Sequence, residues 1–284
     1  MILNSRDAEF IKKTLIIGLP AAGKSTITER IAQKLTEETG IKLEKISTDA
    51  EMTRARKDPA NPIITQFLKD YNISESDREL LRKSPAFMAK YSEEAFRDLE
   101  SRIIVNMLKN GALDNKIVDL GGKAILHPRT AVALKNAGYK VLYLNAKVRN
   151  VLGHVLKDFR GTQNGNPSSR SNVDSFIQER MDGYNKELAS MSWNCFKEYM
   201  QELLAKKDKE SIARATVLLR TRNIAAQTIV RNFHNDRHEK YKAVSDGMID
   251  ITNNLDKDVN LVLAKIRNLN DNSISAVNMQ FRGR

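Results

Sequence analysis

The segment 18–25, which reads G-L-P-A-A-G-K-S, is the feature that most constrains how this chain can fold. It directly follows the apolar run 14–17, and the residues 27–35 after it have helical spacing. Glycines in such a loop allow backbone angles that turn successive N–H groups toward an anion, and the N-terminus of the following helix favours negative charge. In this strand, loop and helix context the pattern predicts a phosphate-binding loop.

Two side chains of this loop have expected roles in nucleotide binding. Lys24 is expected to reach the β- and γ-phosphates of ATP, and the Ser25 hydroxyl is expected to bind Mg²⁺. ATP and Mg²⁺ are therefore the predicted cofactors. The predicted nucleotide-binding residues of the loop are Gly18, Ala21, Ala22, Gly23, Lys24, Ser25 and Thr26.

Composition favours a globular protein with a full core. The chain has 284 residues, of which 41% are hydrophobic. It contains no apolar stretch of the length of a membrane span, and its first residues lack the apolar segment of a signal peptide. The single Cys195 forms no internal disulfide and is interpreted as a buried apolar residue. We expect a cytoplasmic location.

The net charge of +12 is expected to attract anions, among them nucleotides, phosphorylated metabolites, nucleic acids and acidic membrane surfaces. Charge alone does not choose among these classes. Aromatic residues make up only 6% of the chain, and no stacking signature of aromatics interleaves with the basic residues, which argues against a dedicated nucleic-acid binder.

Short apolar runs alternate with longer helical patterns along the chain. Because such alternation is typical of βαβ units, it predicts an α/β fold with a parallel sheet covered by helices on both faces. A closing helix is expected near 256–269. The predicted strands are residues 14–17, 42–46, 116–120, 140–144 and 247–251.

Functional side chains in such sheets gather at the carboxyl ends of the strands. The second predicted strand is followed by S-T-D at 47–49 and the third by G-G-K at 121–123. A helical segment at 92–100 reads S-E-E-A-F-R-D-L-E, and the segment 237–246 before the last strand reads R-H-E-K-Y-K-A-V-S-D.

In this order the four segments and the phosphate loop resemble the motifs of the shikimate kinases. That family has D-T-D, G-E-x-x-F-R-x-x-E, a glycine triplet and R-x-x-x-Y-x-x-x-A-D at the corresponding places. The resemblance covers roughly residues 12–160 and 232–268. It implies a three-layer P-loop fold of the nucleoside-monophosphate-kinase type, with a five-stranded parallel sheet.

The resemblance also implies an activity and a domain plan. The activity is transfer of the γ-phosphoryl group of ATP, with Mg²⁺, to a hydroxyl of a small carboxylated acceptor such as shikimate. The plan is a kinase core made of residues 1–157 and 232–284, with an enlarged lid and helical insertion over 158–231.

The acceptor site implied by the resemblance has two kinds of residue. Asp49 orients the acceptor hydroxyl or accepts its proton, although an aspartate there could instead cap the next helix. Arg97 and Arg237 hold the acceptor carboxylate, although Arg97 could instead form a surface ion pair with Glu100. The backbone at Gly121 and Gly122 approaches the acceptor closely, unless the pair forms an ordinary turn.

This chain departs from the family pattern in the acceptor and metal motifs. Ser47 replaces the first aspartate of D-T-D, which weakens an expected water-mediated contact to Mg²⁺. Asp119, at the end of the third predicted strand, is a candidate to compensate as a Mg²⁺ ligand. Lys123 replaces the third glycine and adds a cation beside the acceptor site.

The largest departure is the insertion. Its first part, 160–170, is rich in glycine, asparagine and serine and is typical of a mobile lid. The resemblance implies that Arg160 packs on the adenine and that Arg170 reaches the phosphates as a catalytic residue. A second R-x-x-x-Y begins at Arg180, so the carboxylate clamp could lie there instead of at Arg237. The part 175–233 is predicted to be a helical hairpin with an arginine-rich second helix.

Two alternatives to a shikimate kinase stay open at this point. One is a kinase of this fold that acts on a different metabolite or on a macromolecule docked on the basic insertion. The other is a nucleotide-dependent module that binds nucleic acid or an acidic protein. The length of the insertion, Ser47 and Lys123 favour the first alternative, and the salt dependence of nucleic-acid binding would test the second.

Overall fold

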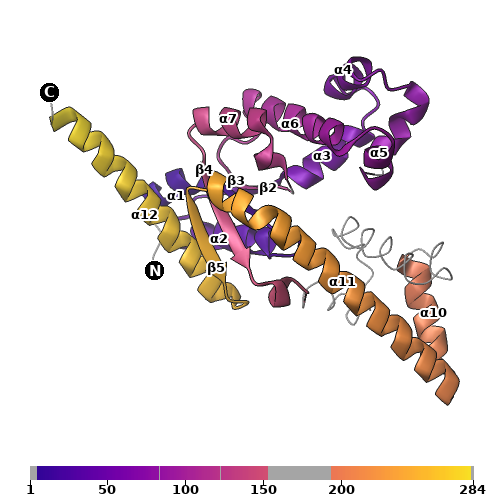
Figure 1. Cartoon of the computed structure of the whole chain (residues 1–284). Coiled ribbons are helices and arrows are strands. Elements are labelled where there is room, and N and C mark those ends of the chain that lie inside the picture. Colours follow the sequence, from indigo (N-terminus) through magenta and orange to yellow (C-terminus); the bar gives the residue numbers. More distant parts are fainter. Residues whose placement is uncertain (1–4, 83, 122, 153–192, 283–284) are drawn as a thin grey trace. The chain divides into compact units, whose positions relative to one another are not determined.

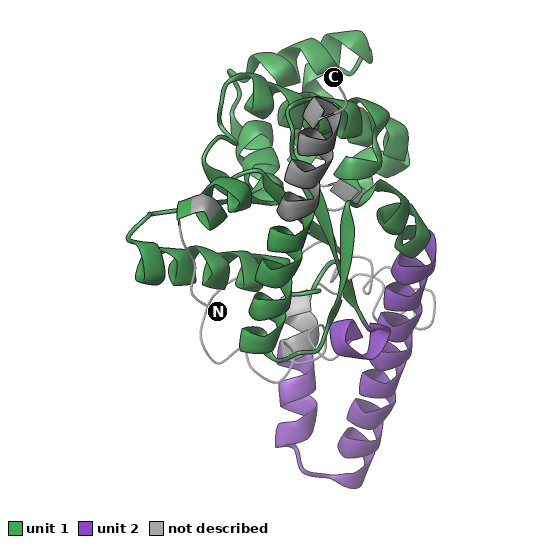
Figure 2. Cartoon of the chain, turned by 90° about the vertical axis from the view of Figure 1, so that its left-hand side faces the viewer, with its two compact units in different colours: residues 1–146, 237–284 green, residues 147–236 purple. Residues whose placement is uncertain are grey.

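The computed structural model describes residues 5–82, 84–121, 123–152 and 193–282. The chain divides into two compact units, one made of residues 1–146 and 237–284 and the other of residues 147–236 (Figure 2). The domain boundaries expected above, at 157 and 232, stay a prediction. Every residue proposed for the phosphate loop and the acceptor site that the structure describes belongs to the first unit.

The first unit is a three-layer α/β fold, as predicted. Its sheet has five parallel strands in the order β2-β3-β1-β4-β5 (Figure 1). The strands are β1 (Thr14–Gly18), β2 (Glu44–Ser47), β3 (Lys116–Asp119), β4 (Lys140–Ala146) and β5 (Gly247–Ile251). All five predicted strands are present. The ends of β5 are as predicted, and those of the other four strands differ from the predicted ends by at most two residues.

Helices cover both faces of this sheet. One group packs together and consists of α1 (Ser5–Ile11), α2 (Lys24–Thr39) and α12 (Leu255–Arg282). The helix α6 (Glu93–Lys109) packs with its neighbours in a second group, which includes α3 (Thr48–Lys57), α4 (Pro62–Asp70), α5 (Ser84–Lys90) and α7 (Pro128–Asn136). The 3₁₀ helix η1 (Glu75–Arg82) connects α4 to α5, and the short η2 (Ala124–Leu126) lies between β3 and α7.

The central strand β1 places the phosphate loop. All five of its residues are buried, and it pairs with β3 on one side and with β4 on the other. A strand that is buried on both faces is expected to be continuously apolar, which agrees with the run L-I-I at its centre. Because the strands are parallel, the loops that follow β1, β2 and β3 all begin at the same edge of the sheet.

The segment 237–246 joins the end of α11 (Lys209–Val244) to the sheet. It lies in α11 and the turn after it, where Tyr241 is fully buried with its ring 5.4 Å from that of Tyr143 on β4. The Tyr143 hydroxyl lies 3.0 Å from Nδ1 of His238. Asp246 accepts a hydrogen bond from the Val141 N–H and donates its own N–H to the Val141 carbonyl, both at 2.8 Å.

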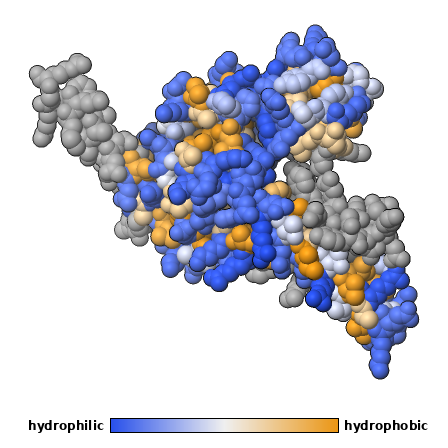
Figure 3. Space-filling model, in the orientation of Figure 1, coloured by the Kyte–Doolittle hydropathy of each residue, from blue (hydrophilic) through white to orange (hydrophobic). Residues whose placement is uncertain are grey.

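The second unit contains a helical hairpin in its described part. Helix α10 (Trp193–Ala205) is followed after three residues by the 36-residue α11 (Figure 2). The Arg214 guanidinium lies 5.6 Å from the centre of the Tyr199 ring, so the two helices lie side by side. This agrees with the predicted hairpin from residue 193 onward. Apolar side chains exposed on it (Figure 3) are Leu204, Ile212, Val217 and Ile224.

No helix in the described part of the chain is both long and apolar enough to cross a membrane.

The start of α6 contains a strained residue. Ser92, which stands where the resembled motif has glycine, has φ 152° and ψ 162°, a conformation that is essentially restricted to glycine and costs about 1–3 kcal/mol in other residues. Its side chain accepts a hydrogen bond from the Ala95 N–H at 3.1 Å and so caps the helix. The cap therefore compensates part of the backbone strain.

We predict that Ser92→Gly stabilises the protein. Relief of strain outweighs the loss of the cap, which costs a few tenths of a kcal/mol, and the entropy cost of glycine, which is about 0.5–1 kcal/mol. A rise of about 1 kcal/mol in the free energy of unfolding is expected in urea titrations.

The matched control for this change is Asn61→Gly. Asn61 caps α4 with an ordinary φ of −63° and accepts hydrogen bonds from two backbone N–H groups. This variant should lose stability, because no strain is relieved. A Ser92→Gly variant that is less stable than the parent would contradict the assignment of strain.

Candidate active site

The phosphate loop has the geometry of an anion cradle. A Cβ atom on Gly18 would lie 2.9 Å from the Leu144 carbonyl oxygen, so only glycine fits where β1 ends. Ala21 has φ 61° and Gly23 has φ 83°, which turns the backbone sharply into α2. The N-cap residue of α2 is Gly23, so no side chain of the cap bonds to the first N–H groups of the helix. The first turn of α2 also contains no acidic residue. Its N–H groups and its dipole are therefore suited to bind an anion.

Lys24 is buried at the base of this cradle. Its ammonium group lies 3.4 Å from the Gly18 carbonyl oxygen and 3.3 Å from that of Leu19. Because both carbonyls belong to the phosphate loop, the Lys24 side chain folds over this loop, and its positive charge faces the space that the loop surrounds. Thr26, the next predicted nucleotide-binding residue after Ser25, is exposed in the first turn of α2.

Ser25 and Asp119 meet at the edge of the sheet. The Ser25 hydroxyl donates a hydrogen bond to Oδ2 of Asp119, which is buried at the end of β3. Ser47 pairs in register with Asp119 on the neighbouring strand. A hydroxyl and a carboxylate next to a phosphate cradle are oxygen donors of the kind that Mg²⁺ prefers when phosphates and water complete its shell. The pair predicted as metal ligands is thus brought together and fits that ion.

Asp49 lies beside the backbone of Gly121. It is the second residue of α3, and the N-cap is Ser47, so the alternative that Asp49 caps this helix is wrong. A Cβ atom on Gly121 would lie 1.7 Å from Oδ1 of Asp49, which means that the carboxylate occupies the place of a side chain at that position. The Gly121 N–H donates to the Thr48 hydroxyl at 2.8 Å and ties the two loops together.

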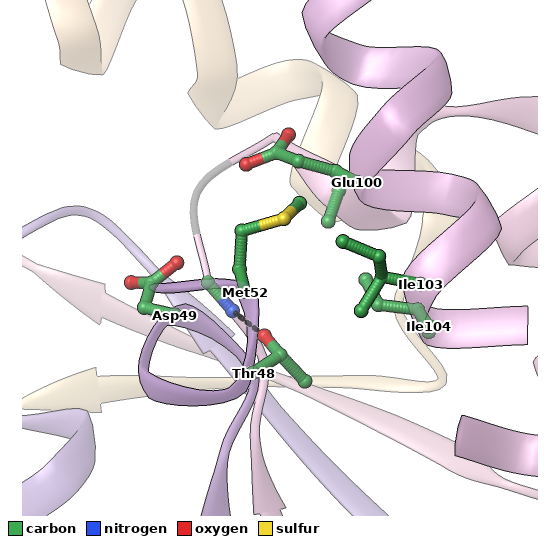
Figure 4. Close-up of a pocket in the computed structure, with 8 residues that line it drawn as sticks. Thr48, Asp49, Met52, Glu100, Ile103 and Ile104 are labelled. Atoms are coloured by element: carbon green, nitrogen blue, oxygen red, sulfur yellow. Dashed lines mark hydrogen bonds between the residues drawn. The ribbon is translucent and has the colours of Figure 1, made fainter. Parts of the chain in front are cut away.

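A narrow crevice opens beside this carboxylate. Figure 4 shows side chains from α3 and α6 on two sides of it and the backbone after β3 on a third. The carboxylates of Asp49 and Glu100 lie at its polar end, and aliphatic side chains form its floor. Its lining consists of Thr48, Asp49, Met52, Glu100, Ile103, Ile104, Gly121 and Ala124.

The charge state of Asp49 depends on its neighbours. The Asp49 side chain is exposed to solvent, although many protein atoms surround it. Burial raises the pKa of Asp49 above its usual 3.8, Lys24 is the largest opposing influence, and Asp119 raises the pKa further. Because solvent still reaches the carboxylate, we expect a smaller shift than for a fully enclosed group.

Arg97 is held by two carboxylates of its own helix. Its Nη1 donates to Glu100 at 2.5 Å, and its Nη2 and Nε donate to Oε1 of Glu93 at 3.0 and 3.2 Å. The ion pair with Glu100 that was expected as an alternative is present, but it is partly buried, because only 9% of the Glu100 side chain is exposed. Burial raises the pKa of Glu100, and Arg97 counteracts this rise.

Arg56 is part of the same cluster and was not predicted from the sequence. Its guanidinium lies 5.5 Å from the centre of the Phe96 ring, and that of Arg97 lies 5.4 Å from the same ring. Arg56 also donates to the Leu81 carbonyl at 2.9 Å, and burial lowers its pKa against the opposing charges of Glu100 and Asp49. The spacing in the sequence could have indicated this position, because residue 56 follows Asp49 by two helical turns and therefore lies on the same face of the helix.

The remaining predicted residues are Arg237 and four positions outside the described part of the chain. Arg237 is buried in α11, and the charges that act most on Asp49 are those of Lys24, Asp119, Arg56 and Arg97. The predicted positions that lie outside the described residues are Gly122, Arg160, Arg170 and Arg180. The roles proposed for all of these residues stay predictions.

We predict that Lys24 lowers the pKa of Asp49 in the native protein. In a ¹³C NMR titration of the carboxyl groups, Asp49 should titrate above 3.8, and Lys24→Met should raise its pKa further because the opposing charge is lost. Since the native state then binds the proton more tightly, the stability contributed by this site is present at low pH and is lost as the pH rises through the raised pKa.

The control for this titration is Lys42→Met, an exposed lysine before the other end of β2. It should leave the Asp49 titration unchanged. An Asp49 pKa that stays constant or falls in Lys24→Met would contradict the described coupling.

Comparisons with known proteins find similarity to one family. The family model described as shikimate kinase matches residues 69–206. The shikimate kinase of Rhodococcus erythropolis is 34% identical over 136 residues, which cover 48% of this chain and 60% of that protein. The shikimate kinase of Enterococcus faecalis is 24% identical over 186 residues, which cover 64% of this chain and 88% of that protein. This chain thus spans less than two thirds of the Rhodococcus relative.

A solved structure of a shikimate kinase from Acinetobacter baumannii, in complex with shikimate, covers 94% of this chain and 98% of its own. It is 14% identical to this chain, with a TM-score of 0.48. The residues that the family model matches include the segments 92–100 and 121–123, whereas the phosphate loop and the segments 47–49 and 237–246 lie outside them. This chain is thus similar in sequence to shikimate kinases over about half of its length.

Proposed function

We propose that this protein transfers the γ-phosphoryl group of ATP to a hydroxyl of a small carboxylated acceptor, with shikimate as the first candidate. The observation that carries this proposal is the position of Asp49. Its carboxylate lies at the edge of the sheet where the phosphate loop begins, is coupled to Lys24, and borders a crevice beside Arg97 and Glu100. The names of the sequence relatives support the choice of shikimate.

The phosphate loop would hold ATP, and the Ser25 hydroxyl and the Asp119 carboxylate would hold Mg²⁺. The ion would neutralise phosphate charge during transfer. Lys24 would stabilise the same charge from the base of the cradle, where the surrounding protein keeps water away from it. Ser47 is near enough to Asp119, as its partner in register, to contribute through water.

Asp49 would accept the proton of the acceptor hydroxyl while the hydroxyl oxygen bonds to the γ-phosphorus and the bond to the β-phosphate oxygen breaks. The products would be ADP and a phosphorylated acceptor. The carboxylate must be ionised to act in this way, and Lys24 favours the ionised form against burial. Most of the rate enhancement would come from positioning and from charge neutralisation.

We predict shikimate-stimulated release of ADP by the full chain in the presence of ATP and Mg²⁺. The measurement is a coupled optical assay with shikimate and related hydroxy acids in parallel. Lys24→Met should lower the turnover at least about 100-fold because it removes charge stabilisation at the transferring group. Binding of ATP without any stimulation by shikimate would contradict the proposed acceptor.

We also predict that Gly121→Ala lowers kcat strongly while leaving stability nearly unchanged. The added methyl group occupies the place of the Asp49 carboxylate, which must rotate away from the acceptor, and a side-chain rotation costs little free energy of unfolding. The control is Gly138→Ala, because a methyl group there meets no atom within 4 Å but is strained at φ 79°. That variant should lose stability and keep its kcat.

A Gly121→Ala variant with the kcat of the parent would mean that Asp49 does not take part in the transfer. A location in the cytoplasm stays an expectation from the sequence.

A further inference from the structure

Lys123 is the residue by which this chain departs from the family's glycine triplet, and the structure places it in a specific contact. It stands just before η2, at the carboxyl end of β3. Its ammonium nitrogen lies 3.2 Å from Oε1 of Glu93, at the start of α6. Only 22% of its side chain is exposed, so this lysine lies against the protein surface.

The same oxygen atom of Glu93 also accepts from Arg97. The distances are 3.0 Å from Nη2 and 3.2 Å from Nε. A single carboxylate is thus held between an ammonium group and a guanidinium group. This is the arrangement that a bound carboxylate ligand would have, with a two-point contact to the arginine and a point charge on its other side.

The two acidic partners of Arg97 differ in how easily they can be replaced. Glu100 is 9% exposed and lines the crevice beside Asp49, whereas half of the Glu93 side chain is exposed. An exposed ion pair contributes little to stability, so Glu93 can leave its place at small cost. The place of the Glu93 carboxylate, between Lys123 and Arg97, would then be open to an incoming carboxylate, while Arg97 keeps its bond to Glu100.

We propose that the carboxylate of the acceptor replaces that of Glu93 and is held between Arg97 and Lys123. This inference rests on the proposed function and deepens it. It makes Lys123 a binding residue for a hydroxy acid, and it makes Glu93 an internal competitor that occupies the carboxylate site of the free protein. The alternative is that the pair of Lys123 and Glu93 only ties η2 to α6.

The test measures binding rather than turnover, by calorimetric titration of the full chain with shikimate and with its methyl ester. Lys123→Met is expected to weaken shikimate binding about five- to tenfold, as the loss of one charged contact does, and to leave binding of the uncharged ester unchanged. Glu93→Gln is expected to strengthen shikimate binding, because the competing charge is lost. The matched control is Lys135→Met, an exposed lysine on α7, which should have no effect.

Two results would overturn the proposal. The first is shikimate binding by Lys123→Met within twofold of the parent. The second is weaker binding in Glu93→Gln, which would show that the pair only supports the local structure. Thermal unfolding of both variants accompanies the titrations, and Lys123→Gln replaces Lys123→Met if the latter does not fold.

The proposed function and this inference fail in different ways. Shikimate binding that depends on Lys123, without any release of ADP from ATP, would reject the kinase activity and support the carboxylate site. Turnover of shikimate without dependence of its affinity on Lys123 would reject only the site. If the parent binds neither shikimate nor cyclohexanecarboxylate at millimolar concentration, the carboxylate site is rejected as well.

Discussion

The parallel pairing of β2, β3 and β1 is the constraint on which the rest of the site depends. It aligns Ser47 with Asp119, and Asp119 with Ile16 of the strand that enters the phosphate loop. Three loops from distant parts of the chain therefore begin at one edge of the sheet, as parallel strands require. The contact between Ser25 and Asp119 and the approach of Asp49 to Gly121 both follow from this register, because a shift of one residue would turn each side chain to the other face.

Much of this arrangement could be predicted from the sequence because it depends on local patterns. Apolar runs and the glycine loop predict the strands and the start of α2, and the residues after the strands predict that Asp49, Asp119 and Gly121 share an edge. The predictions for Cys195 and for the residues of the lid are not tested by the structure. The side chain at 195 and the stretch that contains Arg160 and Arg170 lie outside what the structure describes, so their predicted roles stay open to test.

What could not be predicted is the tertiary pairing of charges. Arg56 follows Asp49 on the same helix face, but its contacts with the Leu81 carbonyl and the Phe96 ring depend on how α3, η1 and α6 pack. Likewise, the sequence shows Lys123 beside two glycines but not that Glu93 lies within reach of it. Arg97 pairs with Glu93 and Glu100, and Lys123 pairs with Glu93. Such balance allows charged residues to line an acceptor site without a large cost of unpaired charge.

The segment 237–246 shows that residues of a sequence motif can be needed for packing rather than for catalysis. Tyr241 is buried against Tyr143, and Asp246 exchanges two hydrogen bonds with the backbone of Val141. Both residues join α11 to the sheet, and neither needs a substrate for its role. A chain that had lost its catalytic groups would still require them in order to fold. Searches that use this segment alone would therefore collect proteins that share a junction between a helix and a sheet, whether or not they share a reaction.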